Sequence, residues 1–247
     1  SWHPAVDRVI VLANRRWRKV PWKAVFGREL FRFIGRLREV QYDLIIDVQG
    51  QLGKTIWIAR LARGRRCGFD WASVREPLAS LAYHQRAAVA KGQHAVERNR
   101  QLFALSLGYP VPAGLGHHGI DRQERFNVRI DPKRLVFLHG TSWRTKQWPV
   151  EYWRALAEMA VRAGYEVWVT WGNAEEKQRA EDLARASERV VVRPKSTLAE
   201  FAKDMAAAAG IVAVDTGLCH LAAALEIPTV SMFGPTSTGL TGGYGES

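Results

Sequence analysis

Residues 210–235, GIVAVDTGLCHLAAALEIPTVSMFGP, constrain the fold more than any other part of this sequence. The apolar and largely β-branched run at 211–214 predicts a short buried strand. A turn follows, and then good helix formers at 218–225, which Pro228 stops. Residues 229–233 predict a second strand. Strand, helix and strand form a βαβ unit, in which the two strands run parallel.

The turn inside this unit carries Asp215-Thr216-Gly217, which is also the active-site signature of aspartic proteases. Aspartic proteases are almost wholly β, whereas here a strand enters the tripeptide and a helix leaves it. The context therefore excludes a protease. Thr216 or Asp215 can cap the helix, and Gly217 lets a ligand approach the backbone. Free amide groups and the positive end of the helix dipole then predict a phosphate site.

The rest of the chain repeats this alternation of strands and helices. Strands are predicted at 9–12, 42–48, 65–69, 135–139, 165–170 and 189–192, and the main helices at 21–38, 94–107, 149–163 and 198–209. A stretch rich in Pro, Gly and His lies between the halves. We therefore predict an α/β protein with two doubly wound domains, 1–115 and 133–247, joined by a linker at 116–132.

Charge is divided unevenly between the two halves. Residues 1–120 hold 20 Lys and Arg against 8 Asp and Glu, whereas residues 121–247 hold 16 of each. A basic half predicts an anionic partner, which could be nucleic acid, a membrane surface, or an acidic lipid or sugar. Cys67 and Cys219 are too few for a disulfide framework or a zinc cluster, which favours a reducing, cytoplasmic location.

Four polar loops follow four predicted strands of the second half. They lie at 139–146, 171–176, 195–197 and 215–220. Any one of them could consist of ordinary caps and loop residues. Because ligands bind beyond the carboxyl ends of parallel strands, four such loops together favour one binding site. A nucleoside diphosphate is the ligand that this combination predicts, with Lys146 and Arg144 adding positive charge for the phosphates.

The same loops carry motifs that resemble a known family. FLHGTSWRTKQWP, TWGNAEEKQRA, RPKSTLAEFA and VAVDTGLCHLAAAL resemble the ADP-heptose:lipopolysaccharide heptosyltransferases, as does PTVSMFGPTSTGLTGGYG. In the first half, SWHPAVDRVI, RRWRK, YDLIIDVQGQLGK, DWASVREPLASL and QHAVERNRQLFALSLGY resemble the type 1 enzymes of this family. The resemblance covers essentially the whole chain. It implies a GT-B fold, in which two Rossmann-like domains face each other across a cleft.

This resemblance also implies a reaction and a donor site. The reaction is an inverting transfer of L-glycero-D-manno-heptose from ADP-heptose to the Kdo of Kdo-lipid A, with ADP as product and neither a cofactor nor a bound metal. Lys146 would neutralise the departing diphosphate and Asp215 would hold heptose or phosphate, so these two are the catalytic candidates. Glu176 would accept hydrogen bonds from the ribose. The full implied donor site comprises Thr141, Ser142, Lys146, Glu176, Ser196, Asp215, Thr216, Gly217 and His220.

The acceptor site implied by the resemblance lies in the basic half. Arg15, Lys19 and Arg75 match positions that bind the Kdo carboxylates and phosphates, and Lys54 is a further candidate. The planar fork of arginine suits carboxylates. An anionic glycolipid would account for the excess charge of this half. It would place the protein on the cytoplasmic face of the inner membrane, as a peripheral protein of a Gram-negative cell with no nucleic-acid partner.

Two parts of the family pattern have no counterpart in this sequence. One is an opening strand and glycine-rich loop whose Asp is the expected general base, and the other is a final helix that crosses back onto the first domain. We therefore expect both ends of the chain to be truncated and this polypeptide to be poorly active. Ser196 stands where some relatives have Met, near the expected adenine.

Three alternatives remain open at this point. The chain could be a heptosyltransferase 2 or another GT-B transferase with a different nucleotide sugar. It could be a basic nucleic-acid-binding protein, although the second half has no excess charge and no binding motif. In the helix at 21–38, Trp22, Phe26 and Phe33 are expected to be core residues. The alternative is that Trp17, Trp22 and the basic residues rest on the inner leaflet.

Overall fold

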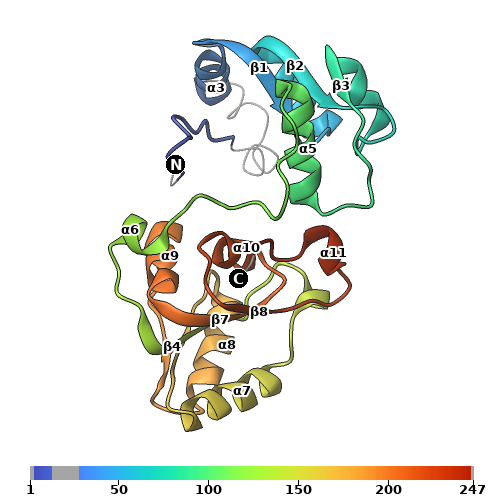
Figure 1. Cartoon of the computed structure of the whole chain (residues 1–247). Helices are drawn as coiled ribbons and strands as arrows, with labels where there is room; N and C mark the ends of the chain where they lie inside the picture. The colour runs from blue at the N-terminus through green and yellow to red at the C-terminus, as the bar shows by residue number, and fades with distance from the viewer. Residues whose placement is uncertain (1–2, 13–27, 246–247) are drawn as a thin grey trace. The chain divides into compact units, whose positions relative to one another are not determined.

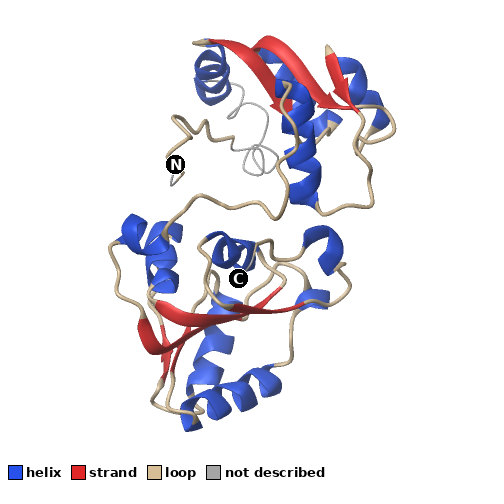
Figure 2. Cartoon of the chain, viewed as in Figure 1, coloured by secondary structure: helices blue, strands red, loops and turns tan. Residues whose placement is uncertain are grey.

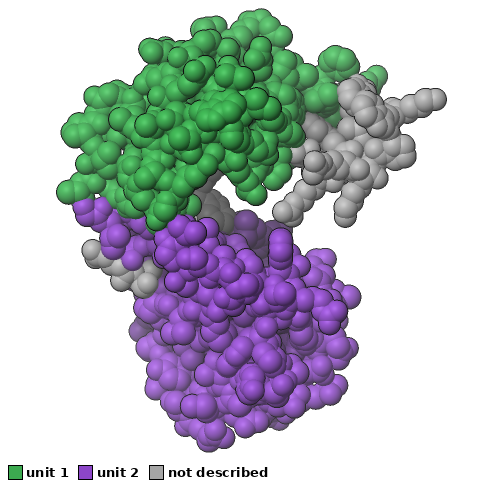
Figure 3. Space-filling view, turned by 90° about the vertical axis from the view of Figure 1, so that its right-hand side faces the viewer, with its two compact units in different colours: residues 1, 3–113 green, residues 2, 114–247 purple. Residues whose placement is uncertain are grey.

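A computed structural model describes residues 3–12 and 28–245 of the chain. The chain forms two compact units, which divide between Ala113 and Gly114 (Figure 3). Each unit contains its own parallel β-sheet with helices packed on it, as the predicted α/β class requires (Figure 2). In the described part of the chain, no helix combines the length and the apolar character that crossing a membrane would need.

Unit 1 is built on a three-stranded sheet of order β1-β2-β3, in which all strands run parallel (Figure 1). Its strands are β1 (Gln41–Asp47), β2 (Arg63–Phe69) and β3 (Gln85–Ala87), and its helices are α3 (Arg28–Arg38), α4 (Trp57–Leu61) and α5 (Ala95–Leu107). A π-helical turn, η1 (Leu52–Ile56), precedes α4, and a 3-10 helix, η2 (Pro77–Ala82), follows β2. His94 caps α5 through its side chain, and Gly108 ends the helix in a left-handed conformation that glycine adopts readily.

The predicted helix at 21–38 is described from Arg28 onward. Phe33 and Leu37 are buried there and pack against a cluster that includes Trp57, so the core assignment of Phe33 is confirmed. Trp17, Trp22 and Phe26 lie outside the described residues. The strand predicted at 9–12 is wrong, because this segment has no regular secondary structure and pairs with no described strand. Its Ile10 and Leu12 instead pack on the same cluster as Phe33.

Unit 2 contains a five-stranded parallel sheet of order β6-β5-β4-β7-β8. Its strands are β4 (Asp131–Leu138), β5 (Glu166–Val169), β6 (Val190–Val192), β7 (Ala208–Val214) and β8 (Thr229–Met232). The chain winds outward from β4 to β6 and then returns to the other side of β4 with β7. The adjacent strands β4 and β7 therefore form the topological switch point, where open α/β sheets bind their ligands.

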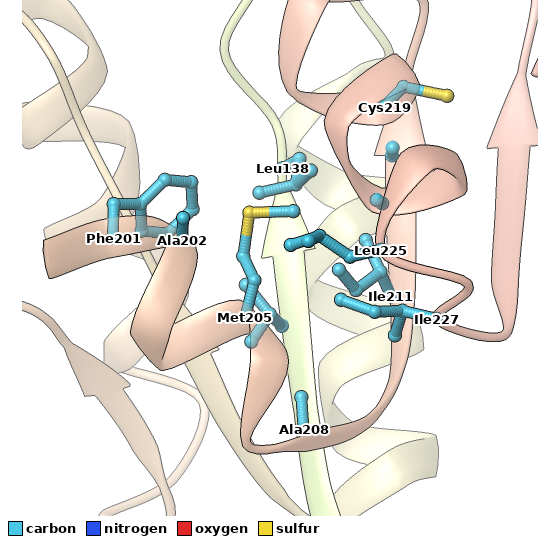
Figure 4. Close-up of a cluster of buried hydrophobic side chains, with 12 residues drawn as sticks. Leu138, Phe201, Ala202, Met205, Ala208, Ile211, Cys219, Leu225 and Ile227 are labelled. Carbon is cyan, nitrogen blue, oxygen red and sulfur yellow. The ribbon is translucent and has the colours of Figure 1, made fainter. Parts of the chain in front are cut away.

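Helices cover both faces of this sheet. Helices α7 (Val150–Arg162) and α8 (Ala174–Ala184) pack on one face, and α9 (Leu198–Ala206) and α10 (Gly217–Ala224) pack on the other. Successive residues of β4 alternate between them, so Val136 and Leu138 join the α9–α10 side while Phe137 joins the α7–α8 side. Figure 4 shows the buried cluster on the α9–α10 side, where Met205 of α9 lies against the strand residues. This packing fixes both sheet faces beneath the loops at the strand ends.

Some predicted boundaries differ from the structure. The helix predicted at 198–209 ends at Ala206, and β7 begins at Ala208, because the run of alanines carries no period that separates helix from strand. Pairing with Asp131 draws Ala208 into the sheet. The segment predicted as a linker, 116–132, contains the short helix α6 (Arg122–Phe126), and Phe126 packs on the core of unit 2.

Candidate functional site

The loops that follow β4 and β7 meet at the switch point. The Thr141 hydroxyl donates a hydrogen bond of 3.2 Å to the Asp215 carbonyl oxygen, which joins the two loops directly. The Asp215 amide donates to the Met232 carbonyl at 3.1 Å, which ties the same loop to β8. Parallel strand pairing therefore brings together residues that are more than 70 positions apart in the sequence.

A cavity of about 300 Å³ opens beside these loops. Five of the nine predicted donor-site residues line it, namely Thr141, Ser142, Glu176, Ser196 and Thr216. They come from the ends of four different strands, as the strand-end argument predicts. Lys146, Asp215, Gly217 and His220 do not line the cavity itself, but Asp215 and Gly217 flank its lining residue Thr216. The predicted residues thus form a pocket and an adjoining charged segment.

Sequence analysis missed the apolar wall of this pocket. Leu198, Phe201 and Leu218 line it together with Pro194 and Leu138. Leu198 and Phe201 lie three residues apart on the first turn of α9, and Leu198 is more than half exposed. Their spacing was visible in the sequence, but it is the same spacing that core residues have. An apolar wall facing polar groups suits a flat heterocycle such as a nucleobase.

Glu176 is held at the mouth of the pocket by the first turn of α8. Its carboxylate accepts a 2.7 Å hydrogen bond from the Gly172 amide, and its own amide donates to the Asn173 side chain that caps the helix. A Cβ atom on Gly140 would lie 2.8 Å from the Glu176 Cδ atom, so only glycine leaves room for this carboxylate. The arrangement presents a fixed acceptor to the pocket, as ribose hydroxyls require.

An ion pair between Lys146 and Asp215 adjoins the pocket. The Lys146 Nζ atom lies 2.6 Å from the Asp215 Oδ2 atom, and the Asp215 side chain is only 8% exposed. Burial would raise the pKa of Asp215, but hydrogen bonds from Lys146 and Thr236 and the charges of Lys146 and His220 outweigh it and lower that pKa. Asp215 is therefore a carboxylate at neutral pH, and it holds the ammonium of Lys146 in place.

The loop after β8 supports this pair, which the sequence did not reveal. Thr236 in this loop helps to lower the pKa of the Asp215 carboxyl group. A Cβ atom on Gly234 would lie 2.9 Å from the Thr145 carbonyl oxygen, so the backbone at Gly234 packs directly against the turn that carries Lys146. Both residues belong to the GPT motif at 234–236, whose partners only the folded chain identifies.

Helix α10 begins beside the ion pair, and its capping differs from the prediction. Thr216 occupies the N-cap position but its side chain makes no capping hydrogen bond, and Asp215 pairs with Lys146 instead. The first turn of α10 therefore keeps its amides uncapped by a side chain. A Cβ atom on Gly217 would meet nothing within 4 Å, so the surface beside Gly217 is open. This geometry favours an anion at the helix start.

In unit 1, two of the predicted acceptor residues lie on adjoining segments. Lys54 in η1 and Arg75 before η2 are both exposed. The Leu52 amide donates to the Glu76 carboxylate at 2.7 Å, and the Glu76 amide donates to the Gly50 carbonyl at 3.3 Å. These bonds hold the two cationic segments side by side. Arg15 and Lys19 lie outside the described residues.

A buried carboxylate that sequence analysis did not single out organises this part of unit 1. Asp47, at the end of β1, accepts hydrogen bonds from the Gln49 and Gly50 amides at 2.9 and 3.1 Å. It also accepts from the Thr55 hydroxyl at 2.7 Å and the Tyr83 hydroxyl at 2.9 Å. Burial, together with the charge and hydrogen bonding of Asp47, raises the pKa of Tyr83. Asp47 thus fixes the loop that presents Lys54.

Comparison with known proteins agrees with this geometry. Two parallel α/β units and a pocket at the switch point are the features of a GT-B glycosyltransferase. The chain belongs to glycosyltransferase family 9 (heptosyltransferase), whose model matches residues 30–247. In the described part of the chain, no cluster of three His, Cys, Asp or Glu residues could hold a metal ion.

Several similar proteins are heptosyltransferases. The chain is 52% identical to lipopolysaccharide heptosyltransferase 1 of Pseudomonas aeruginosa, over all of this chain and 70% of that protein. It is 44% identical to the protein of the same name from Escherichia coli K12, over all of this chain and 78% of that protein. A structure of E. coli heptosyltransferase WaaC with ADP superimposes with a TM-score of 0.93, at 44% identity, covering 99% of this chain and 77% of that one.

Proposed function

We propose that this glycosyltransferase moves L-glycero-D-manno-heptose from ADP-heptose to the Kdo of Kdo-lipid A, in the inner core of lipopolysaccharide. The observation that carries the proposal is the Lys146–Asp215 ion pair of 2.6 Å beside the open start of α10 and the pocket of unit 2. The names of the similar proteins and the ADP in the E. coli structure support the choice of donor.

The donor site assigns each part of the nucleotide sugar to one group of residues. The base packs on the apolar wall around Phe201, and the ribose hydroxyls donate to Glu176. The pyrophosphate lies at the start of α10, near Gly217, where amides and the helix dipole favour negative charge. Ser142 and Ser196 supply further hydrogen bonds from opposite loops.

Lys146 has the catalytic role on the donor side. When the glycosidic bond to ADP breaks, negative charge grows on the diphosphate, and an ammonium already held in place stabilises that charge without first reorganising. Asp215 keeps the ammonium there through the ion pair and is itself close enough to the pyrophosphate position to orient the heptose. His220, exposed one turn into α10, adds a donor on the same side.

The acceptor is bound by unit 1. Lys54 and Arg75, with Arg15 and Lys19, pair with the carboxylates and phosphates of Kdo-lipid A. A lipid-borne acceptor places the protein in the cytoplasm, as a peripheral protein on the inner face of the inner membrane. A heptosyltransferase 2 is the second candidate, because it would share the donor site. Its support is weaker, since such a protein from Escherichia coli K12 is 32% identical over 82% of this chain, against 44% and 52% over the whole chain for two heptosyltransferases 1.

Ligand-dependent stability tests the donor site. ADP at about 100 times its Kd should raise the free energy of unfolding by roughly 2.7 kcal/mol, and GDP or UDP should do so far less. Lys146→Ala should remove most of the ADP effect, whereas Lys133→Ala, at the start of β4 and away from the pocket, should leave it unchanged. Equal stabilisation by all three nucleotides, or an unaltered response in Lys146→Ala, would refute the assignment.

The transferase step is tested with ADP-heptose and Kdo-lipid A together. The acceptor should gain the mass of one heptose as ADP is released in equal amount, at the low rate expected of this polypeptide, and Lys146→Ala should reduce both together. An acceptor that already carries one heptose distinguishes the two candidates. If only that acceptor is extended, the protein is a heptosyltransferase 2.

A further inference from the structure

Helix α3 at the edge of unit 1 has two faces of different character (Figure 1). Phe33 and Leu37 are buried, and Leu30 and Ile34 are half-buried; all four pack on one cluster. Their spacing of three and four places them on a single stripe of the helix. This stripe attaches α3 to unit 1, and it leaves the opposite face to the solvent.

The exposed face of α3 is mainly basic, with Glu29 as the one acidic residue of the helix, and it has an aromatic ring within it. Arg28, Arg32 and Arg36 are exposed and follow one another at intervals of four residues, and Arg38 is exposed at the end of the helix. Phe31, next to Arg28 and Arg32 on this face, is 70% exposed. Gly35 completes the face with no side chain, and a Cβ atom there would meet nothing within 4 Å.

The stability of unit 1 does not explain this composition. Like charges four residues apart repel each other and weaken a helix. The exposed Phe31 ring adds little packing to the fold, because Phe33 and Ile34 supply the attachment to the core. The face is therefore suited to something outside the chain that is both anionic and apolar.

We propose that this α3 face docks on an anionic phospholipid surface, with its arginines at the lipid phosphates and Phe31 at the boundary between headgroups and acyl chains. A helix with an apolar residue among basic ones binds such a surface lying flat. Each basic side chain adds electrostatic attraction to anionic lipids. The inference rests on the proposed function only in that a lipid-borne acceptor gives the protein a reason to reach the membrane.

Nucleic acid fits this face less well. Phosphate contacts alone would use the arginines and would leave Phe31 without a role, whereas a lipid surface uses both kinds of side chain. The membrane proposal therefore predicts that loss of the arginines and loss of the Phe31 ring each weaken binding. A nucleic-acid surface predicts that only loss of the arginines weakens binding.

Vesicle flotation with the full chain tests the proposal. One set of vesicles contains phosphatidylcholine alone and the other adds phosphatidylglycerol; neither contains any acceptor. The protein should float with the anionic vesicles, should bind neutral ones much more weakly, and should be released by about 0.5 M salt, which shortens the screening length to a few ångströms. Arg32→Gln/Arg36→Gln should weaken partitioning about 30-fold, and Phe31→Ser about tenfold.

A matched double variant in unit 2 provides the control. Arg162→Gln/Arg185→Gln removes two arginines whose side chains are 69% and 72% exposed, so it changes net charge equally while leaving α3 intact. It should float as the unaltered protein does. Each α3 variant should also keep its stabilisation by ADP, because the nucleotide pocket lies in unit 2. Lost flotation with retained ADP binding supports docking through α3, whether or not heptose transfer is confirmed.

Three results would overturn the proposal. The first is flotation that is equal with neutral and anionic vesicles, and the second is flotation unaffected by both α3 variants. The third is no flotation at all, combined with duplex DNA binding that Arg32→Gln/Arg36→Gln abolishes and Phe31→Ser preserves. That last pattern would identify the face as a nucleic-acid surface.

Discussion

Units 1 and 2 are both parallel α/β layers, but they use the carboxyl ends of their strands differently. In unit 2, loops from four strands converge on one pocket and bury a charge, Asp215, against Lys146. In unit 1, the buried acidic side chain is Asp47, which accepts hydrogen bonds from its own loop and from Tyr83, and the cations Lys54 and Arg75 are exposed. Unit 2 therefore presents a pocket beside a buried ion pair, whereas these two cations of unit 1 lie on its exposed surface.

The largest expected effect tests this contrast through one lysine of each unit. Lys146→Met leaves the almost fully buried Asp215 carboxylate without its ammonium, which should lower the free energy of unfolding by about 2–3 kcal/mol. Lys54→Met changes an exposed side chain and should stay within about 0.5 kcal/mol of the unaltered protein. Urea unfolding of both variants measures the difference. If both variants lost a similar free energy of unfolding, the contrast between a buried ion pair in unit 2 and an exposed lysine in unit 1 would be wrong.

The second effect is a dependence of stability on pH that comes from His139. This residue is 2% exposed, donates from Nε2 to the Thr170 carbonyl at 3.0 Å, and joins the ends of β4 and β5 beneath the pocket. Burial, with the charge of Arg179, lowers its pKa to about 4 from an ordinary 6.5. Below pH 6.5 the His139 ring is protonated in the unfolded chain, but in the folded chain it stays neutral down to about pH 4. The free energy of unfolding therefore falls as the pH falls from 6.5 to 4.

Between pH 7 and pH 5 this linkage should amount to about 2 kcal/mol. The unaltered protein should lose that much more stability over this range than His139→Gln, which has no titrating ring. Urea titrations of both proteins at the two pH values give the difference, in which the other titrating groups cancel. An equal loss in the two proteins would mean that His139 takes up its proton in the folded state as readily as in the unfolded one.

A third, smaller effect concerns the fit of Glu176. In Gly140→Ala the new methyl group would lie 2.8 Å from Glu176 Cδ, so the carboxylate must move away from the Gly172 amide. ADP affinity should fall by about 1–2 kcal/mol, roughly tenfold, as titration calorimetry would show. Gly92→Ala in unit 1, where a Cβ atom meets nothing within 4 Å, is the control and should bind ADP normally. Unchanged ADP affinity in Gly140→Ala would remove Glu176 from the ribose site.

The smallest expected effect tests whether Arg75 of unit 1 affects acceptor binding without affecting ADP binding. Arg75→Gln should raise the KM for Kdo-lipid A by severalfold, because an exposed ion pair contributes only about 0.2–1 kcal/mol. ADP affinity should not change, since Arg75 belongs to unit 1. A change in ADP affinity without one in the acceptor KM would reverse the assignment of Arg75.

Much of the architecture could be predicted from local patterns. The apolar β-branched runs before Asp47 and Asp215 predicted β1 and β7, and the alternation of strands and helices predicted the α/β class. Boundaries were less certain where composition carries no period, as in the alanine run that became the start of β7. The strand predicted at 9–12 shows the same limit, since a β-branched run becomes a strand only when a neighbouring strand offers hydrogen bonds.

By itself, the sequence determined which residue types stand at the strand ends, and through its motifs it determined the family. Only the tertiary structure decided which of those residues meet. Lys146 and Asp215 are 69 positions apart, and their pairing depends on β7 lying beside β4 in the sheet. The apolar wall around Phe201, the support of Asp215 by Thr236 and the outward position of Phe31 arise in the same way, because side-chain burial depends on what packs above each residue and local sequence does not contain that information.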